Sequence, residues 1–236
     1  MIAILDADSL LYAIGSINIH ENIVSNVLDN KIKNILSSIN MYNVLIVIQG
    51  KRNFRNKYDN DYKKHRIGTK PQYYHILRQH LINNYNPFIA NNIETDDVCA
   101  IAANYCRNIN CDYIVVHLDK DLNQIPGKHF NYNNNTLYEV TEKTGMYNLC
   151  MQLITGDITD SKITGIRGYG QKKAKKLLDN ESDHHLLTKV FNEYILIYNE
   201  EGIEKFYNSY KLLKLIENYP KITKRLKNII DKLCNM

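Results

Sequence analysis

The chain has 236 residues, of which 44% are hydrophobic and 23% are charged, and its formal net charge is +5. This composition is typical of a folded globular protein, and no apolar run reaches the roughly 18 residues that a membrane-spanning helix needs. The five cysteines show no CxxC spacing, so reduced thiols are favoured over a zinc site. The N-terminus enters an apolar run at once, so we expect no secretory signal and a cytoplasmic location.

Short apolar runs alternate with helical periodicities up to about residue 145. The strands expected are 2–6, 44–48, 88–90, 113–118, 128–132 and 136–140, and the helical segments are 10–14, 23–39, 73–84 and 95–108. This alternation predicts an α/β fold with a central, mostly parallel sheet flanked by helices. The pattern then stays helical to the end. We therefore expect a domain at 1–148 and a small C-terminal helical module at 149–236.

Carboxylates gather where predicted strands end. Asp6 and Asp119 each follow a strand, and Asp121 lies two residues further on. The sequence ETDD at 94–97 opens the helix at 95–108, where acids are also favoured simply as helix caps. The carboxyl ends of parallel strands meet at one edge of a sheet. Unpaired acids there would repel one another, and an oxygen-only ligand set selects Mg²⁺ or Mn²⁺.

Basic residues lie in two separate segments. Residues 51–78 hold nine basic residues and two acids, and residues 162–176 hold six basic residues and no acid. Solvated charged faces explain most such runs. Two of them around an acidic centre instead favour a polyanion whose phosphate is brought to metal ions.

Four ordered motifs resemble those of the flap-endonuclease/5′→3′ exonuclease family. They are LDADSLLY at 5–12, ETDDV at 94–98, LDKDL at 118–122 and GDITDSKITGI at 156–166. The resemblance runs from residue 2 to about residue 178. It implies a PIN-like nuclease domain, a helical arch at about 51–72, and a helix–three-turn–helix in the C-terminal module.

The same resemblance implies two divalent metal ions, Mg²⁺ or Mn²⁺, which activate water and stabilise the leaving oxygen. Asp97 would be a ligand or would support one. The first metal site would use Asp6, Glu94, Asp96 and Asp119, and the second would use Asp121, Asp157 and Asp160.

One position departs from the family pattern. The family usually has an Asp at the end of its second strand, whereas here that strand is followed by Gln49. A neutral amide oxygen is a poorer Mg²⁺ ligand than a carboxylate. Asp8 either compensates for the missing acid or caps the helix that follows.

The basic segments correspond to family regions that contact DNA. The sequence YKKHR at 62–66 resembles the arch motif, so Lys63 and Arg66 would contact the scissile phosphate and Tyr62 would stack on a base. A glycine-rich turn then enters a helix near residue 171, with K⁺ often bound there in the family. The remaining residues expected to bind nucleic acid are Lys51, Arg52, Arg55, Lys64, Gly165, Gly168, Gly170, Lys172, Lys173 and Lys176.

The resemblance thus implies a monomeric, structure-specific 5′ nuclease that leaves 5′-phosphate products. Its partner would be DNA with a 5′ single-stranded end or flap, or an RNA primer–DNA hybrid, and no sliding-clamp motif is evident. Two alternatives stay open. One is a structure-specific DNA-binding protein with weakened catalysis, because of Gln49. The other is a PIN-type ribonuclease, against which the arch and the glycine turn argue.

Overall fold

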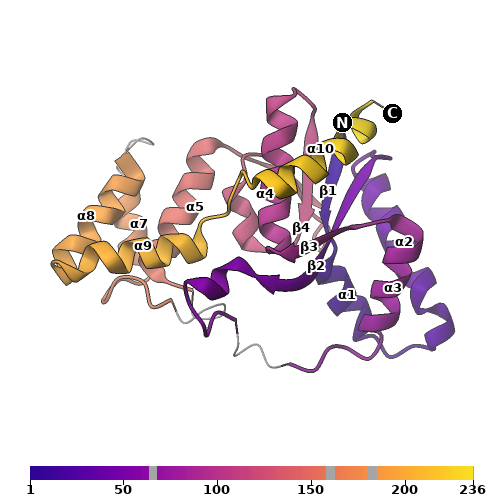
Figure 1. The fold of residues 1–236 in the computed structure, drawn as a ribbon, viewed down its shortest axis with the longest axis horizontal. Coiled ribbons are helices and arrows are strands. Elements are labelled where there is room, and N and C mark those ends of the chain that lie inside the picture. The colour runs from indigo at the N-terminus through magenta and orange to yellow at the C-terminus, as the bar shows by residue number, and fades with distance from the viewer. Residues whose placement is uncertain (64–67, 158–162, 180–184, 236) are drawn as a thin grey trace.

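The fold is built on one six-stranded sheet with the order β3-β2-β1-β4-β5-β6 (Figure 1). We describe it from a computed structural model, which covers residues 1–63, 68–157, 163–179 and 185–235. Five strands are parallel, and β6 pairs with β5 in the antiparallel sense. The strands are β1 (Ile2–Asp6), β2 (Val44–Asn53), β3 (Phe88–Asn92), β4 (Tyr113–His117), β5 (Gly127–Asn131) and β6 (Thr136–Val140). The predicted α/β class is therefore confirmed.

Helices cover both faces of the sheet, as a parallel sheet requires. One apolar core joins alternate strand residues such as Ala3, Leu5 and Ile46 to α1, α2 and α3. The other joins the opposite residues, such as Ile4 and Val47, to α4 and α10. These helices are α1 (Asp8–Gly15), α2 (Glu21–Ser38), α3 (Tyr74–Tyr85), α4 (Thr95–Asn108) and α10 (Pro220–Cys234).

A third apolar core forms a helical module beside the sheet, at the left of Figure 1. Its helices are α5 (Glu142–Thr155), α7 (Gln171–Leu178), α8 (Leu186–Tyr198) and α9 (Glu201–Leu213). After α9 the chain turns back, and α10 packs on α4 rather than within this module. The last helix thus belongs to the core of the sheet, although the sequence places it with the C-terminal module.

The expectation of reduced cysteines is wrong for one pair. Cys111, which precedes β4, forms a disulfide with Cys234 at the end of α10, over a sequence separation of 123 residues. The return of α10 across α4 brings the two thiols together, which no local spacing reveals. Cys99, Cys106 and Cys150 are free and buried, consistent with a packing role.

The second strand is longer than predicted. It continues past Gln49 to Asn53, because Gln49 pairs with Ala90 of β3 before the register shifts. The 3₁₀ helix η1 (Phe54–Lys57) follows, and turns lead to Lys63. Within the described part of the expected arch, η1 is the one helical turn, and residues 64–67 at its centre lie outside the description.

No helix among the described residues has the length and apolar character needed to cross a bilayer.

Candidate active site

An open cavity of about 1190 Å³ lies at the carboxyl edge of the sheet. Acids from four places in the fold contribute to its lining. Asp6 ends β1, Asp8 begins α1, Glu94 and Asp96 lie at the start of α4, and Asp119 follows β4. The structure therefore brings together the four acids expected at the first metal site, and the topology of a parallel sheet explains why.

The turn that carries Asp119 is held from two sides. The Asp119 carboxylate caps the 3₁₀ helix η2 (Lys120–Gln124) by accepting the Asp121 N–H at 2.9 Å. The carbonyl oxygen of Asp119 lies 2.6 Å from Nδ1 of buried His117, whose Nε2 lies 2.7 Å from Nδ1 of His129. Burial lowers the pKa of each imidazole to about 4. A neutral histidine pair therefore supports this turn, a feature that the sequence analysis did not identify.

The cavity acids disfavour one another's ionisation. Burial, and then the neighbouring charges of Asp8 and Asp119, raise the pKa of Asp6 to about 8. Burial also raises the pKa of Asp96 well above its ordinary value, with the charges of Asp6 and Asp119 adding to the effect. Without a cation, part of this cluster is protonated at neutral pH.

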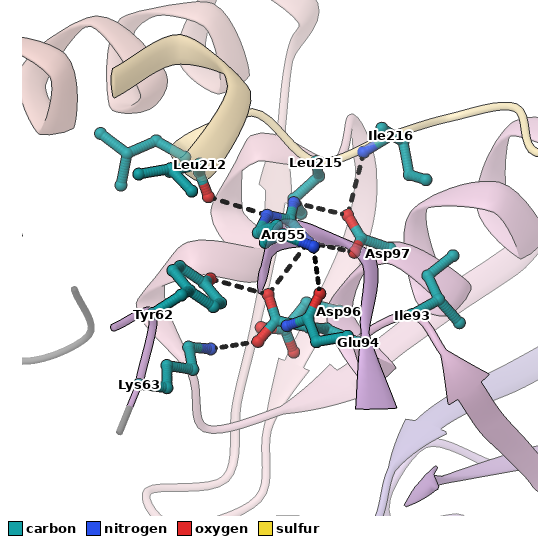
Figure 2. Close-up of polar contacts among 12 residues, drawn as sticks. Arg55, Tyr62, Lys63, Ile93, Glu94, Asp96, Asp97, Leu212, Leu215 and Ile216 are labelled. Atoms are coloured by element: carbon teal, nitrogen blue, oxygen red, sulfur yellow. Dashed lines mark hydrogen bonds and ion pairs between the residues drawn. The ribbon is translucent and has the colours of Figure 1, made fainter. Parts of the chain in front are cut away.

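Glu94 differs because cations already surround it. Burial alone would raise its pKa, but the charges of Lys63 and Arg55 outweigh burial and lower it. The Lys63 ammonium forms an ion pair with Oε1 of Glu94, and the Tyr62 hydroxyl donates to Oε2 at 2.9 Å. Figure 2 shows both arch residues reaching Glu94 from the same side. The positions expected to contact DNA therefore hold Glu94 in this conformation, and buried Tyr62 is not free to stack on a base.

Asp97 does not line the cavity, which argues against the first of its two expected roles, that of a metal ligand. It is fully buried and forms a bidentate ion pair with Arg55, whose Nη2 lies 2.9 Å from Oδ1. The Ile216 N–H donates to the same oxygen at 3.1 Å. With its charge matched and both oxygens occupied, Asp97 stabilises the packing of α4 instead (Figure 2).

Arg55 is likewise corrected as a DNA-binding residue. Its side chain is 1% exposed. Besides its two acids, it donates to the carbonyl oxygens of Leu212 at 2.9 Å and Lys214 at 3.0 Å. Every donor group of the guanidinium thus has a partner, and η1 is tied to the segment that joins α9 to α10.

Two acids expected at the second metal site lie next to the first group. Burial and the charges of Asp119 and Asp157 raise the pKa of Asp121 to about 6. The Gln152 amide donates to Asp121 Oδ1. Asp157 is buried, and Lys120 Nζ lies 3.9 Å from its Oδ2. Asp160 lies outside the described residues.

A divalent cation fits the chemistry of this donor set. In the part of the chain that the structure describes, no three His, Cys, Asp or Glu side chains converge closely enough to enclose a metal ion as they stand. However, the acids supply only oxygen atoms, and burial with the charges of neighbouring acids raises the pKa of Asp6, Asp96 and Asp121. A buried oxygen, Asp8 Oδ1, has no hydrogen-bond partner. A hard cation would neutralise such a cluster.

The other residues expected to bind DNA are distributed around the cavity and along α7. Lys51 and Arg52 are exposed and line the cavity. Lys64 and Arg66 lie outside the described residues. Sequence reasoning did not single out Lys70 and Arg78, which line the same cavity and extend its basic side. Their membership in the basic run at 51–78 was the available signal.

The glycine turn divides into a structural and an accessible part. Gly165 has φ +64, and an added Cβ would lie 2.4 Å from the Gly156 backbone nitrogen, so Gly165 is needed for the turn itself. Gly168 and Gly170 are exposed, with open space where a Cβ would lie, and φ +81 at Gly168 also favours glycine there. The lysines of α7 are also exposed, namely Lys172, Lys173, Lys175 and Lys176. This surface can accept a phosphate backbone.

The mostly parallel sheet has acids at its carboxyl edge, basic residues line the same cavity, and the helical module presents a lysine-rich helix. This combination is typical of a nuclease. Residues 2–150 match the family described as 5′-3′ exonuclease, N-terminal resolvase-like domain. The chain therefore belongs to the 5′-3′ exonuclease family. No curated protein sequence matches it.

Solved structures share the fold over nearly the whole chain. The 5′-exonuclease of T5, solved with divalent zinc ions, has a TM-score of 0.74 at 15% identity, covering 98% of this chain and 99% of that one. The flap endonuclease of bacteriophage T5, in a pseudo-enzyme–product complex with DNA and metal ions, has a TM-score of 0.70 at 13% identity, covering 100% and 99%. The catalytic core of Rad2 with a DNA substrate has a TM-score of 0.53 at 13% identity, covering 100% and 73%.

Proposed function

We propose that this protein is a structure-specific 5′ nuclease, acting as a 5′→3′ exonuclease or flap endonuclease on DNA by a two-metal mechanism. The observation that carries the proposal is the cavity in which buried and half-buried acids from β1, α1, α4 and the turn after β4 meet among basic residues. The similarity of this chain's fold to proteins solved with divalent metals and DNA supports the same conclusion.

The acids divide by position into two groups that would hold the metals. Asp6, Glu94, Asp96 and Asp119 line the cavity. Asp121 and Asp157 lie beside them, close enough for the charge of Asp157 to raise the pKa of Asp121. Divalent ions held there would supply activation of a water molecule and stabilisation of the leaving 3′ oxygen.

The chain itself would position the phosphate. Lys63 carries a positive charge at the wall of the cavity, and its pKa is raised to about 12, since Glu94 outweighs the effect of burial. Lys51 and Arg52 add charge along the same rim. If Glu94 turned to a metal ion, the Lys63 ammonium would be released toward a scissile phosphate, where positive charge stabilises the transition state.

The exposed lysines of α7 would hold duplex DNA at a second place. They face solvent on one helix that follows the accessible glycines Gly168 and Gly170. Contacts of this kind bind the sugar-phosphate backbone without reading sequence. A nuclease that recognises DNA structure rather than sequence needs this kind of surface.

A cleavage assay tests the proposal. A 5′-labelled flap duplex, a blunt duplex and a single-stranded RNA are incubated with Mg²⁺, Mn²⁺ or EDTA. Metal-dependent release of 5′ products from the flap is the expected result. Cleavage of RNA alone would contradict it and favour a ribonuclease.

A second candidate is a structure-specific DNA-binding protein with weakened catalysis. The side chain of Gln49 favours it, because all of its polar atoms bond to the backbone and none is directed to a cation. Binding of the flap without cleavage in either metal would establish this second function and exclude the first.

A further inference from the structure

Gln49 of β2 contributes an amide to the cavity, where the neighbouring strands contribute acids. The Gln49 side chain is fully engaged. Its Nε2 donates to the carbonyl oxygens of Ala90 at 3.3 Å and Ile93 at 3.0 Å, and its Oε1 accepts the Thr95 N–H at 3.2 Å. Gln49 therefore joins β2 to the start of α4, and its neutral side-chain oxygen is directed to the Thr95 N–H.

The backbone of Gln49 instead orients a different side chain. Its N–H donates to Asp8 Oδ2 at 3.0 Å. Asp8 is the first residue of α1, two positions after Asp6, and it lines the same cavity. A backbone donor on a central strand fixes the direction of one carboxylate oxygen and thereby of the other.

The other oxygen of Asp8 is unsatisfied. Oδ1 is buried, and it has no hydrogen-bond partner. The positive charges that face Asp8 come from Arg78 and Lys70, but no ion pair of Asp8 occurs among the described residues. A buried charged oxygen without a partner is costly and calls for a missing cation or water.

We infer that Asp8 Oδ1 binds the divalent cation held by Asp6 and Asp119, so that Asp8 supplies the carboxylate that β2 lacks at Gln49. This inference rests on the proposed metal-dependent function. Gln49 then acts as a positioning residue: its N–H holds Asp8, and its amide holds the first turn of α4. The cation site would draw on β1, α1, α4 and the turn after β4.

Direct Mn²⁺ binding to the full-length protein, measured by electron paramagnetic resonance without DNA, tests the inference. Asp8→Asn keeps the shape and removes the charged ligand, and it should weaken Mn²⁺ binding at least tenfold, or about 1.4 kcal/mol. Asp112→Asn removes an exposed carboxylate before β4, at the opposite edge of the sheet, and should leave binding unchanged. Asp8→Ser, which removes the carboxylate altogether, repeats the test if the Asn variant fails to fold.

The double variant Asp8→Asn/Arg78→Met separates this role from a simple charge balance. If Asp8 binds the cation, Mn²⁺ binding should stay weak in the double variant, whereas recovery of wild-type affinity would show that Asp8 only offsets the charge of Arg78 and would overturn the inference. Wild-type Mn²⁺ affinity in both Asp8 variants would overturn the inference while leaving the proposed nuclease function intact. Failure of the wild-type protein to bind Mn²⁺ or to cleave a flap would overturn both.

Discussion

Adjacent acids at the start of α4 illustrate two ways of burying a carboxylate. Asp97 is fully buried and is paired with Arg55, so its charge is matched within the protein. Asp96 faces the cavity, where its nearest charged neighbours include Asp6 and Asp119, and burial with these charges raises its pKa. The charge of Asp97 is balanced by its partner, whereas the cavity around Asp96 has an excess of negative charge.

The difference separates structural acids from functional ones. A matched buried ion pair contributes to the fold and offers nothing to a ligand, whereas removal of one partner leaves a costly unpaired charge. A group of unmatched acids needs a cation from outside the chain. Glu94 lies between the two cases, because it contacts both Arg55 and the arch residue Lys63.

The largest effect is expected from Asp96→Asn. It removes one acid from the cavity, and the flap-cleavage rate should fall by roughly a thousandfold or more, about 4 kcal/mol in transition-state stabilisation. The variant should stay as stable as the wild type, because a repulsive charge is lost. Single-turnover kinetics measure the rate, with Asp112→Asn as the control for charge. Cleavage by Asp96→Asn at the wild-type rate would show that the reaction does not take place at this cavity.

Arg55→Met should instead affect stability. The variant leaves Asp97 buried without its partner and loses the bonds to Leu212 and Lys214. The free energy of unfolding should fall by roughly 3–5 kcal/mol. Urea unfolding measures it, and Arg52→Met is the matched control, because Arg52 is exposed three residues earlier. Equal stability of the two variants would show that the buried network is not structural.

Loss of the Cys111–Cys234 disulfide should have a smaller effect. The bond closes a loop over 123 residues and holds α10 to the core of the sheet. Cys234→Ser should lower the free energy of unfolding by roughly 2–4 kcal/mol. A reductant should destabilise the wild type by the same amount and leave the variant unaffected. Insensitivity of the wild-type protein to reductant would contradict the presence of this bond.

The smallest effect concerns pH. The pKa of Asp6 is raised to about 8, so the folded state keeps a proton that the unfolded chain loses above about pH 4. Without metal, stability should therefore fall as pH rises toward 8 and level off above it. We expect the melting temperature to fall by a few degrees between pH 7 and 8.5, because one proton difference over this window lowers stability by roughly 1 kcal/mol. Asp6→Asn should reduce this slope, and an unchanged slope would assign it to other groups.

The sequence predicts helices, strands and motifs more readily than it predicts which side chains contact one another. Apolar periodicity and the order of the motifs are local signals, so the strands and the acids at their ends are found where expected. Arg55 looks like a DNA contact because it lies in a basic run, yet its acid is 42 residues away and its carbonyl partners lie in residues 212–214. Cys111 and Cys234 are equally remote. Long-range packing decides such roles, and spacing does not encode it.

The most direct test of the account is the metal-induced shift in melting temperature of Asp96→Asn and Asp97→Asn, compared at pH 8 with and without Mn²⁺. If Asp96 belongs to the metal site and Asp97 to the structure, Asp97→Asn should melt lower than the wild type yet keep its Mn²⁺-induced increase. Asp96→Asn should lose most of that increase. The opposite pattern, in which the shift persists in Asp96→Asn and disappears in Asp97→Asn, would contradict the division of acids proposed for this site.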